Sequence, residues 1–347
     1  MKKLFSGDGP RITVIGGGTG MSVILRGLKR ITENLAAVVT MADDGGGSGM
    51  LREDLGMLPP GDVRSCLLAL ADVEHDFGEL MQYRFQDGML AGQNMGNLII
   101  AGLAMMAGSF EKGLEKAHDI FRISGRVIPV TCEEITLCAR LSGGTIVRGE
   151  SNIPNTVLAG EGKIQEVYLE PKNVQTWEDA RAAIRQADII IIGPGSLYTS
   201  LIPNLLVGGI GEELTDSEAI KVLVCNVMTQ KGETDGFGPL DHVREIEKYM
   251  KGSRLDYVFV NNKRVDEETA RRYYEDGSVP VILQPGEAEL LKRRGLQVIQ
   301  EDFIDVKMGY VRHNADKIAR KVAEIFGNRD LPLLCEIPGE CRLATKE

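Results

Sequence analysis

Residues Arg11 to Ser22 read Arg-Ile-Thr-Val-Ile-Gly-Gly-Gly-Thr-Gly-Met-Ser. The apolar run that ends at Ile15 predicts a buried strand, and the apolar spacing from Met21 to Leu28 predicts a helix. A glycine turn between a strand and a helix presents backbone N–H groups and a helix N-terminus to a phosphate. A turn without a ligand would use the same residue types, but we expect this one to bind a nucleotide. The residues expected to contact its phosphates are Gly16, Gly17, Gly18, Thr19 and Gly20.

Neither of the two standard nucleotide fingerprints fits this turn. The dinucleotide pattern G-x-G-x-x-G requires a small third residue, and its two alignments place Met21 or Val23 there. The P-loop pattern requires a lysine before Ser or Thr, and no lysine follows the glycines. The turn is therefore of neither standard kind, and NAD stays open as an alternative ligand.

Composition limits the classes of function. The chain has 347 residues and a net charge of −10, which argues against a general nucleic-acid or anionic-membrane surface. Six cysteines without a Cys-x-x-Cys pair and only four histidines argue against a structural zinc site. No apolar run is long enough to span a bilayer, and the first ten residues lack a signal-peptide core. We expect a cytoplasmic protein without membrane insertion.

A second apolar run, Leu35 to Val39, predicts a buried strand that is followed by Asp43 and Asp44. In dinucleotide-binding folds an acid after the second strand contacts a ribose, about 20 residues beyond the glycines. Adjacent carboxylates can equally hold a divalent cation, or they can start an Asx turn that enters a flexible loop. We expect Asp43 and Asp44 to contact a nucleotide, and to hold Mg²⁺ if the protein is an enzyme.

The unbroken apolar run Ile189 to Ile192 predicts a parallel strand that is covered on both faces. A second glycine turn follows it, from Gly193 to Ser200, and a further strand from Lys221 to Cys225 ends in polar residues. Because ligands of open α/β sheets bind at the carboxyl ends of strands, these loops should share one crevice with the first turn. The additional contacts expected there are Gly195, Ser196, Ser200 and Asn226.

Two helix starts carry polar residues whose roles stay open. Asp62 is predicted to be the N-cap of a helix that runs to Leu70. Asn97 lies at the polar start of the apolar helix predicted from Asn94 to Met106, where it is either an internal cap or a ligand contact. We include Asn97 among the candidate nucleotide-binding residues.

These elements together predict an α/β fold, a Rossmann-like three-layer sandwich with a mostly parallel sheet and a small antiparallel β insertion. Residues 1–10 form an N-terminal extension, and residues 11–326 form a single domain with the β-rich insertion at about 126–170. Residues 327–347 contain two prolines and no periodicity, so we expect a loosely attached tail.

Six blocks in order resemble the YvcK-type gluconeogenesis factor family (UPF0052). They read Ile15-Gly-Gly-Gly-Thr-Gly20, Ala42-Asp-Asp-Gly-Gly46, Pro59-Pro-Gly-Asp-Val-Arg64, Gly96-Asn-Leu-Ile99, Ile192-Gly-Pro-Gly-Ser-Leu-Tyr-Thr-Ser200 and Cys225-Asn-Val-Met-Thr-Gln230. The resemblance runs from about Arg11 to Phe326, and it departs at Gly47, where the family usually has serine. The chain is also distantly similar to the 2-phospho-L-lactate transferases of deazaflavin cofactor synthesis.

The resemblance implies a cytoplasmic bacterial protein that is required for growth on gluconeogenic carbon sources and for cell shape and cell-wall morphogenesis. It also implies binding of UDP-sugars such as UDP-N-acetylglucosamine, without a required cofactor and without demonstrated catalysis. The family's binding positions that match this sequence are the Gly16–Gly20 turn, Asn226, Tyr273 and Arg312. Tyr273 would stack on the uracil or the sugar, and Arg312 would contact the phosphates.

The leading hypothesis is therefore a regulatory protein that binds a nucleotide sugar. The alternative is a Mg²⁺-dependent transferase that moves a phospho-organic acid from a nucleotide diphosphate, with the metal on Asp43 and Asp44. No catalytic residue is assigned, because no histidine pairs with a nucleophile and Ser196 is not in a G-x-S-x-G elbow. We expect regulatory protein partners, no nucleic acid, and leave a homo-oligomer open.

Overall fold

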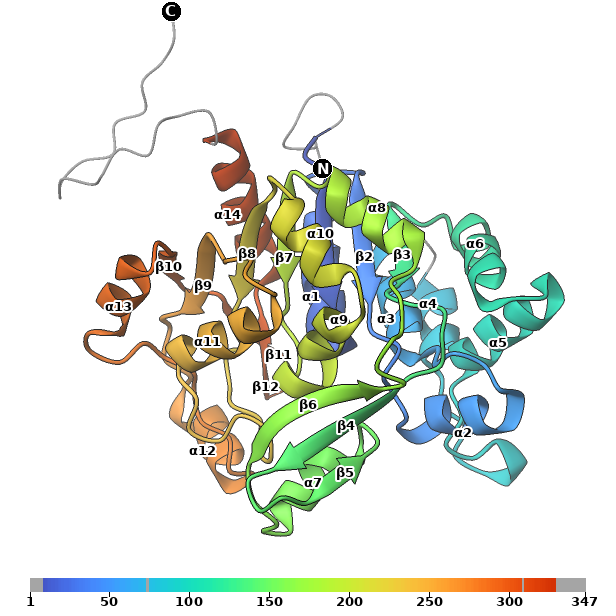
Figure 1. Cartoon of the computed structure of the whole chain (residues 1–347). Helices are drawn as coiled ribbons and strands as arrows, with labels where there is room; N and C mark the ends of the chain where they lie inside the picture. Colours follow the sequence, from blue (N-terminus) through green and yellow to red (C-terminus); the bar gives the residue numbers. More distant parts are fainter. Residues whose placement is uncertain (1–8, 73–74, 308, 329–347) are drawn as a thin grey trace, which may run out of the picture.

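The computed structural model describes residues 9–72, 75–307 and 309–328, and a seven-stranded sheet runs through its centre (Figure 1). Every neighbouring pair of its strands is parallel. The predicted α/β fold is therefore confirmed. In spatial order the strands are β10 (Gln297–Glu301), β9 (Tyr257–Asn261), β8 (Ile220–Val224), β7 (Ile189–Ile192), β1 (Ile12–Gly16), β2 (Leu35–Val39) and β3 (Arg126–Pro129).

The direction of the chain across the sheet reverses between β1 and β7. From β1 the chain passes outward to β2 and β3, and from β7 it passes outward on the other side to β8, β9 and β10. A ligand crevice forms at such a switch point, beyond the carboxyl ends of the two central strands. The two glycine turns of the sequence follow β1 and β7, so the fold brings them to the same point.

Helices cover both faces of the sheet, which explains why β7 consists of four fully buried isoleucines. Figure 1 shows one layer in front of the sheet and another behind it. The back layer packs α1 against both α3 and α14, and the front layer packs α10 against α8 and α9. Their bounds are α1 (Gly18–Leu28), α3 (Gly61–Leu70), α14 (Ala315–Gly327), α8 (Glu178–Gln186), α9 (Ile202–Leu206), α10 (Ile210–Asp216) and α11 (Pro239–Tyr249).

The antiparallel insertion is shorter than expected. Residues Arg126–Pro129 were expected inside it, but they form β3, the edge strand of the main sheet, in parallel register with β2. The buried run Val127 and Ile128 suits that place, because it is covered by the helical layers. The separate antiparallel sheet has the order β5-β4-β6, and its elements are β4 (Thr136–Leu141), β5 (Ile146–Arg148), α7 (Asn152–Leu158) and β6 (Ile164–Glu170).

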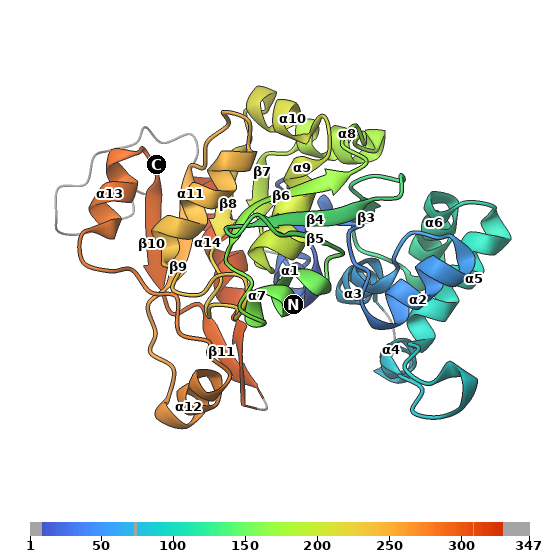
Figure 2. The ribbon, with the colours of Figure 1, turned by 60° about the horizontal axis from the view of Figure 1, so that its bottom comes forward.

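A helical lobe separates β2 from β3 along the chain and lies at one side of the molecule (Figure 2). The glycine-rich segment after Asp44, which the Asx-turn alternative took to be a flexible loop, starts α2 at Gly46, whose φ of +46° suits glycine. The lobe consists of α2 (Gly46–Leu55), α3, α4 (His75–Gln82), α5 (Met95–Ala107) and α6 (Phe110–Phe121).

The chain ends with α12 (Glu267–Glu275), α13 (Glu287–Arg293), β10, a hairpin of β11 (Ile304–Lys307) and β12 (Tyr310–His313), and α14. Residues 329–347 of the predicted tail and residues 1–8 of the predicted extension lie outside the described residues. Within the described part of the chain, no helix combines the length and the apolarity that crossing a bilayer requires.

Candidate functional site

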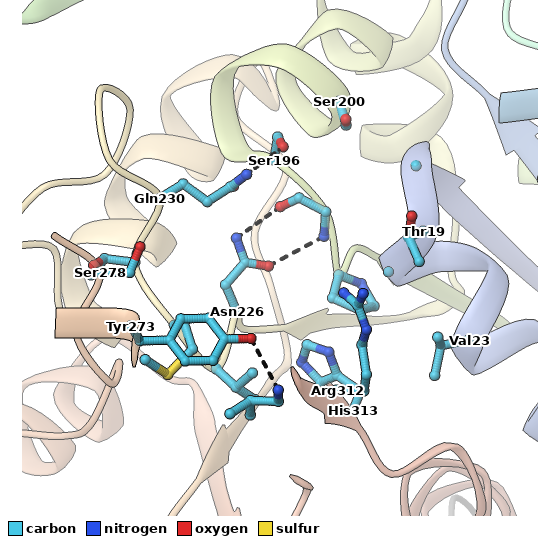
Figure 3. A pocket seen from close by; sticks show the side chains of 18 residues that line it. Thr19, Val23, Ser196, Ser200, Asn226, Gln230, Tyr273, Ser278, Arg312 and His313 are labelled. Atoms are coloured by element: carbon cyan, nitrogen blue, oxygen red, sulfur yellow. Dashed lines mark hydrogen bonds between the residues drawn. The ribbon is translucent and has the colours of Figure 1, made fainter. Parts of the chain in front are cut away.

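A cavity of about 380 Å³ opens at the switch point between β1 and β7 (Figure 3). Its walls come from five places in the sequence: the turn after β1, the turn after β7, the loop after β8, α12 with the loop that follows it, and β12. Nine of the predicted site residues line it, and these are Gly18, Thr19, Gly20, Gly195, Ser196, Ser200, Asn226, Tyr273 and Arg312.

The turn after β1 is an uncapped helix start. The N-cap of α1 is Gly17, which has no side chain to bond the free N–H groups of the first turn. Gly18 has a φ of +69°, a left-handed conformation that other residues adopt only with strain. Asp62 accepts from the Gly18 N–H, and the remaining N–H groups of the first turn, together with the helix dipole, favour an anion in the adjoining cavity.

Direct contacts hold the two glycine turns together. A Cβ atom added at Gly20 would lie 2.8 Å from the carbonyl oxygen of Pro194. The fully buried Asn204 donates from Nδ2 to the carbonyl oxygens of Gly16, at 3.1 Å, and Ser200, at 2.8 Å. The turns after β1 and β7 therefore form one rigid wall.

Asn226 acts on this wall from the loop after β8. Its side-chain oxygen accepts from the Gly195 N–H at 3.2 Å, and its Nδ2 donates to the Gly195 carbonyl at 2.8 Å (Figure 3). Both polar ends of the amide are thus occupied by Gly195, so Asn226 lines the cavity and also fixes the second turn. Beside it, Gln230 Nε2 donates to Ser196 Oγ at 2.7 Å.

Arg312 brings the positive charge. Its guanidinium lies 5.4 Å from the centre of the Tyr310 ring, and no carboxylate of the described residues lies within 4.0 Å of it. Tyr273 from α12 accepts at its hydroxyl from the Val311 N–H at 3.0 Å, which attaches α12 to β12 (Figure 3). A free cation thus faces the two turns that offer N–H groups.

The other five predicted site residues lie outside the cavity. Gly16 and Gly17 lie behind the turn, where Gly17 is against Thr40 and Asp62. Asp44 accepts from the N–H groups of Glu150, at 2.8 Å, and Ser151, at 2.9 Å, so it holds the insertion. Asp43 accepts from the Gly45 N–H at 3.0 Å.

Asn97 is not the internal cap that one interpretation of the sequence predicted. The N-cap of α5 is Asn94, whose side chain accepts from the Asn97 N–H at 3.2 Å. The Asn97 side chain instead accepts from Arg64 Nε at 2.9 Å. It therefore orients a cation and does not reach the cavity.

Asp62 is not the N-cap that the sequence predicted. Pro60 occupies the cap position of α3, and Asp62 lies in the first turn, where it accepts from the Gly18 backbone. Burial and the nearby Asp43 raise the pKa of Asp62 to about 6. The acid thus supports the glycine turn from behind.

Two further acids meet behind the second turn, and sequence reasoning missed both. Thr199 Oγ1 donates to Glu233 at 3.2 Å and also bonds to Glu150 of the insertion. Burial, with Asp43 and Asp44 nearby, raises the pKa of Glu150 to about 8, and burial raises that of Glu233 to about 7. No motif marks these acids, because each comes from a different part of the chain.

Replacing Glu150 by Gln is expected to stabilise the protein at pH 8.5 and not at pH 5. The folded pKa lies above the ordinary 4.5, so acidification favours the folded state, and stability is lost as the pH rises through about 8. Glutamine imitates the protonated acid, and we expect a gain of about 2 kcal/mol at pH 8.5. Urea unfolding of both proteins at pH 5 and at pH 8.5 measures this difference in the free energy of unfolding. The control Glu53→Gln changes an exposed acid of α2 and should leave both stabilities unchanged.

Further residues that were not predicted from the sequence line the cavity, among them His313, Gln230 of the loop after β8, and Ser278. His313 lines the cavity and contacts the Cys225 carbonyl through Nε2 at 3.1 Å. Burial lowers its pKa to about 4, so the ring is neutral at pH 7. Gln230 belongs to a block already noted in the sequence, whereas Ser278 follows no strand and carried no signal.

A divalent cation fits this region only in part. In the described part of the chain, no three acidic, histidine or cysteine side chains gather as metal ligands. Asp44 uses both carboxylate oxygens on backbone N–H groups. Asp43 and Asp62 are close enough to interact, and Mg²⁺ commonly takes one or two carboxylates together with ligand phosphates.

Comparisons with known proteins agree on the family. The model of the family described as 2-phospho-L-lactate transferase CofD matches residues 12–304. A homologue named gluconeogenesis factor from Thermoanaerobacterium thermosulfurigenes is 48% identical over 320 residues, 92% of this chain and 98% of that protein. The gluconeogenesis factor of Bacillus subtilis is 41% identical over 321 residues, 92% of this chain and 99% of that protein. The crystal structure of a UPF0052 family member from Bacillus halodurans matches with a TM-score of 0.85 at 42% identity, covering 93% of this chain and 99% of that one.

Proposed function

The chain belongs to the gluconeogenesis factor family, which the CofD family model also covers, and from this premise we propose that it is a regulatory protein that binds a nucleotide sugar. The observation that carries the proposal is Arg312, a cation without a carboxylate partner among the described residues, which faces two glycine turns across one cavity. Such an arrangement suits the diphosphate of a ligand such as UDP-N-acetylglucosamine.

The diphosphate would lie between the α1 N-terminus and the Gly195–Ser200 turn. Free N–H groups on one side and the Arg312 guanidinium on the other would make charge-assisted hydrogen bonds to its oxygens. The cavity volume of about 380 Å³ lies in the range of small-molecule sites. Tyr273 would then present its ring to the uracil or the sugar, with its hydroxyl held by Val311.

The proposed cellular role follows from the family. Ligand occupancy would report the supply of nucleotide sugar to protein partners in the cytoplasm, and so link growth on gluconeogenic carbon to cell-wall morphogenesis and cell shape. No cofactor is required for such a role. A second nucleotide, NAD, could enter the same crevice.

The second candidate is a transferase of the 2-phospho-L-lactate transferase type, and the match to that family model over residues 12–304 favours it. In such a transferase, Mg²⁺ bound next to the cavity would neutralise the phosphates of the leaving nucleotide. Asp43 together with Asp62 would hold it, in place of the pair Asp43 and Asp44. The chain's own residues would hold the nucleotide as described above.

Calorimetry with UDP-N-acetylglucosamine, GDP and NAD, each with and without Mg²⁺, tests these functions. We expect the UDP-sugar to bind more tightly than the other two, with the same affinity in Mg²⁺ and in EDTA, and to be recovered unchanged. Binding that requires Mg²⁺, or conversion of the nucleotide, would support the transferase. Absence of UDP-sugar binding would overturn the leading proposal.

A further inference from the structure

Arg64 is a half-buried cation of the helical lobe, where α3, α4 and α5 pack together (Figure 2). It stands near the N-terminus of α3, where the helix dipole disfavours positive charge. Among the described residues, no carboxylate lies within 4.0 Å of its guanidinium. A charge that is partly removed from water is costly unless it is paired. The position of Arg64 is therefore explained neither by its helix nor by an ion pair of the fold.

Two contacts fix the direction of the Arg64 side chain. Its stem lies over Gly96, where an added Cβ would be 2.6 Å from Arg64 Cδ. At the end of the stem, Nε donates to Asn97 Oδ1 at 2.9 Å. Only the oxygen of this amide can face the guanidinium, since arginine has no acceptor. The start of α5 thus holds the arginine in one orientation, while Nη1 and Nη2 make no hydrogen bond to any described residue.

A second arginine lies beside the first. Arg84 forms a β-bridge with Asn94, the N-cap of α5, and its Nη1 donates to the Gly92 carbonyl. Within the described part of the chain, Arg84 makes no ion pair either. Burial and the nearby Arg84 lower the pKa of Arg64. The two like charges disfavour each other, so an anion next to both would be bound favourably.

The acids near Arg64 are engaged elsewhere. Asp62 accepts from the Gly18 backbone, and Asp43 accepts from the Gly45 N–H at 3.0 Å. Both are near enough to oppose the lowering of the Arg64 pKa, yet neither forms an ion pair with it. They offset part of its charge and leave its Nη donors to another acceptor.

We propose that Arg64, Arg84 and Asn97 form a second binding site, the lobe site, for the phosphate of a small phosphomonoester. The Asn97 oxygen is occupied by Arg64, so the groups that these three side chains still offer are N–H donors. Phosphate oxygens accept hydrogen bonds, and a guanidinium binds them through two parallel N–H groups. A phosphomonoester carries a charge of about −2 at pH 7, which two arginines match.

The lobe site is distinct from the nucleotide cavity. None of its three residues lines that cavity, where Arg312 is the cation. Asp62 stands between the two places, because its carboxylate is held by Gly18 of the first glycine turn and Arg64 follows it on the same helix. The chain can therefore hold a nucleotide and a phosphomonoester at the same time. The lobe site does not depend on which nucleotide the cavity binds.

Calorimetric titration of the Arg312→Ala variant with glycerol 3-phosphate tests the lobe site, because this variant lacks the cation of the nucleotide cavity. We expect it to bind one molecule per chain. Adding Arg84→Gln should weaken this binding about tenfold, and adding Arg64→Gln about 100-fold, because each removes charge-assisted hydrogen bonds. The matched control Lys116→Gln removes the same charge from an exposed position of α6 in the same lobe, and we expect an affinity within about twofold.

Arg84 is exposed, so its replacement does not put the fold at risk, and circular dichroism checks the fold of every variant. Inorganic phosphate, titrated in the same way, should bind more weakly than the ester. Equal or tighter binding of inorganic phosphate would assign the site to the free ion and overturn the proposed ligand. The site itself is overturned if Arg312→Ala binds neither compound. It is equally overturned if the folded Arg84→Gln and Arg64→Gln combinations bind as tightly as Arg312→Ala alone, since Arg64 would then serve only to hold Asn97.

Discussion

Arg312→Ala is expected to weaken UDP-sugar binding by about 100-fold while the fold remains intact. A charge-assisted hydrogen bond contributes about 1.5–3 kcal/mol, and tenfold in affinity corresponds to about 1.4 kcal/mol. The guanidinium is exposed and makes no ion pair within 4.0 Å among the described residues, so its removal breaks no salt bridge of the fold. Titration calorimetry measures the affinity, and urea unfolding measures the stability.

Arg320→Ala is the matched control, because it removes the same charge from an exposed position of the neighbouring α14. This substitution changes the long-range electrostatic field of the protein by the same amount, but Arg320 does not line the cavity. We expect its affinity to lie within about threefold of the native value. If both variants bind equally well, Arg312 is not a phosphate ligand.

The parts of the fold that the sequence predicted correctly are those set by local patterns. The four consecutive isoleucines of β7 predict a strand that is buried on both faces, whatever its neighbours are. The glycines after β1 predict a turn with a positive φ, which other residues adopt only with strain. Their meeting at one crevice followed from a general property of parallel sheets, namely that carboxyl ends share an edge. Nine of the fourteen predicted site residues consequently line the cavity.

The predicted residues that do not line the cavity are held by contacts distant in sequence. Asp44 was read as a ligand contact from its place after β2, but the insertion more than a hundred residues later supplies two N–H groups to its carboxylate. Asp62 fitted a local cap pattern, yet its carboxylate is held against Gly18. Arg312 and Tyr273 entered through family resemblance alone, because no local pattern places β12 opposite β1.

The Glu150–Glu233 pair is a contact that the sequence alone did not predict. Each acid in isolation resembles a solvated surface residue, and only the folded chain brings them to a shared Thr199. Their raised pKa values link the insertion to the turn after β7. Deprotonation above pH 8 therefore weakens an attachment that supports one wall of the cavity.

Gly20→Ala is expected to lower UDP-sugar affinity by at least about 30-fold, although alanine favours a helix over glycine by about 1 kcal/mol. The new Cβ would lie 2.8 Å from the Pro194 carbonyl oxygen and 3.0 Å from its carbon. Both are backbone atoms, and ordinary contacts begin at 3.4 Å, so the two turns must move apart by several tenths of an ångström. A displacement on this scale would stretch hydrogen bonds from the two turns to the proposed diphosphate beyond the usual limit of about 3.2 Å.

Gly78→Ala is the control for this change, because it lies in helix α4 and its added Cβ meets nothing within 4 Å. It should raise the free energy of unfolding by about 0.5–1 kcal/mol and leave the affinity unchanged. Calorimetry and urea unfolding on both variants separate the two effects. If Gly20→Ala gains stability like Gly78→Ala and keeps native affinity, the diphosphate does not lie between the turns. A loss of affinity in Gly20→Ala alone would support the shared wall, since the two variants add the same methyl group to a helix.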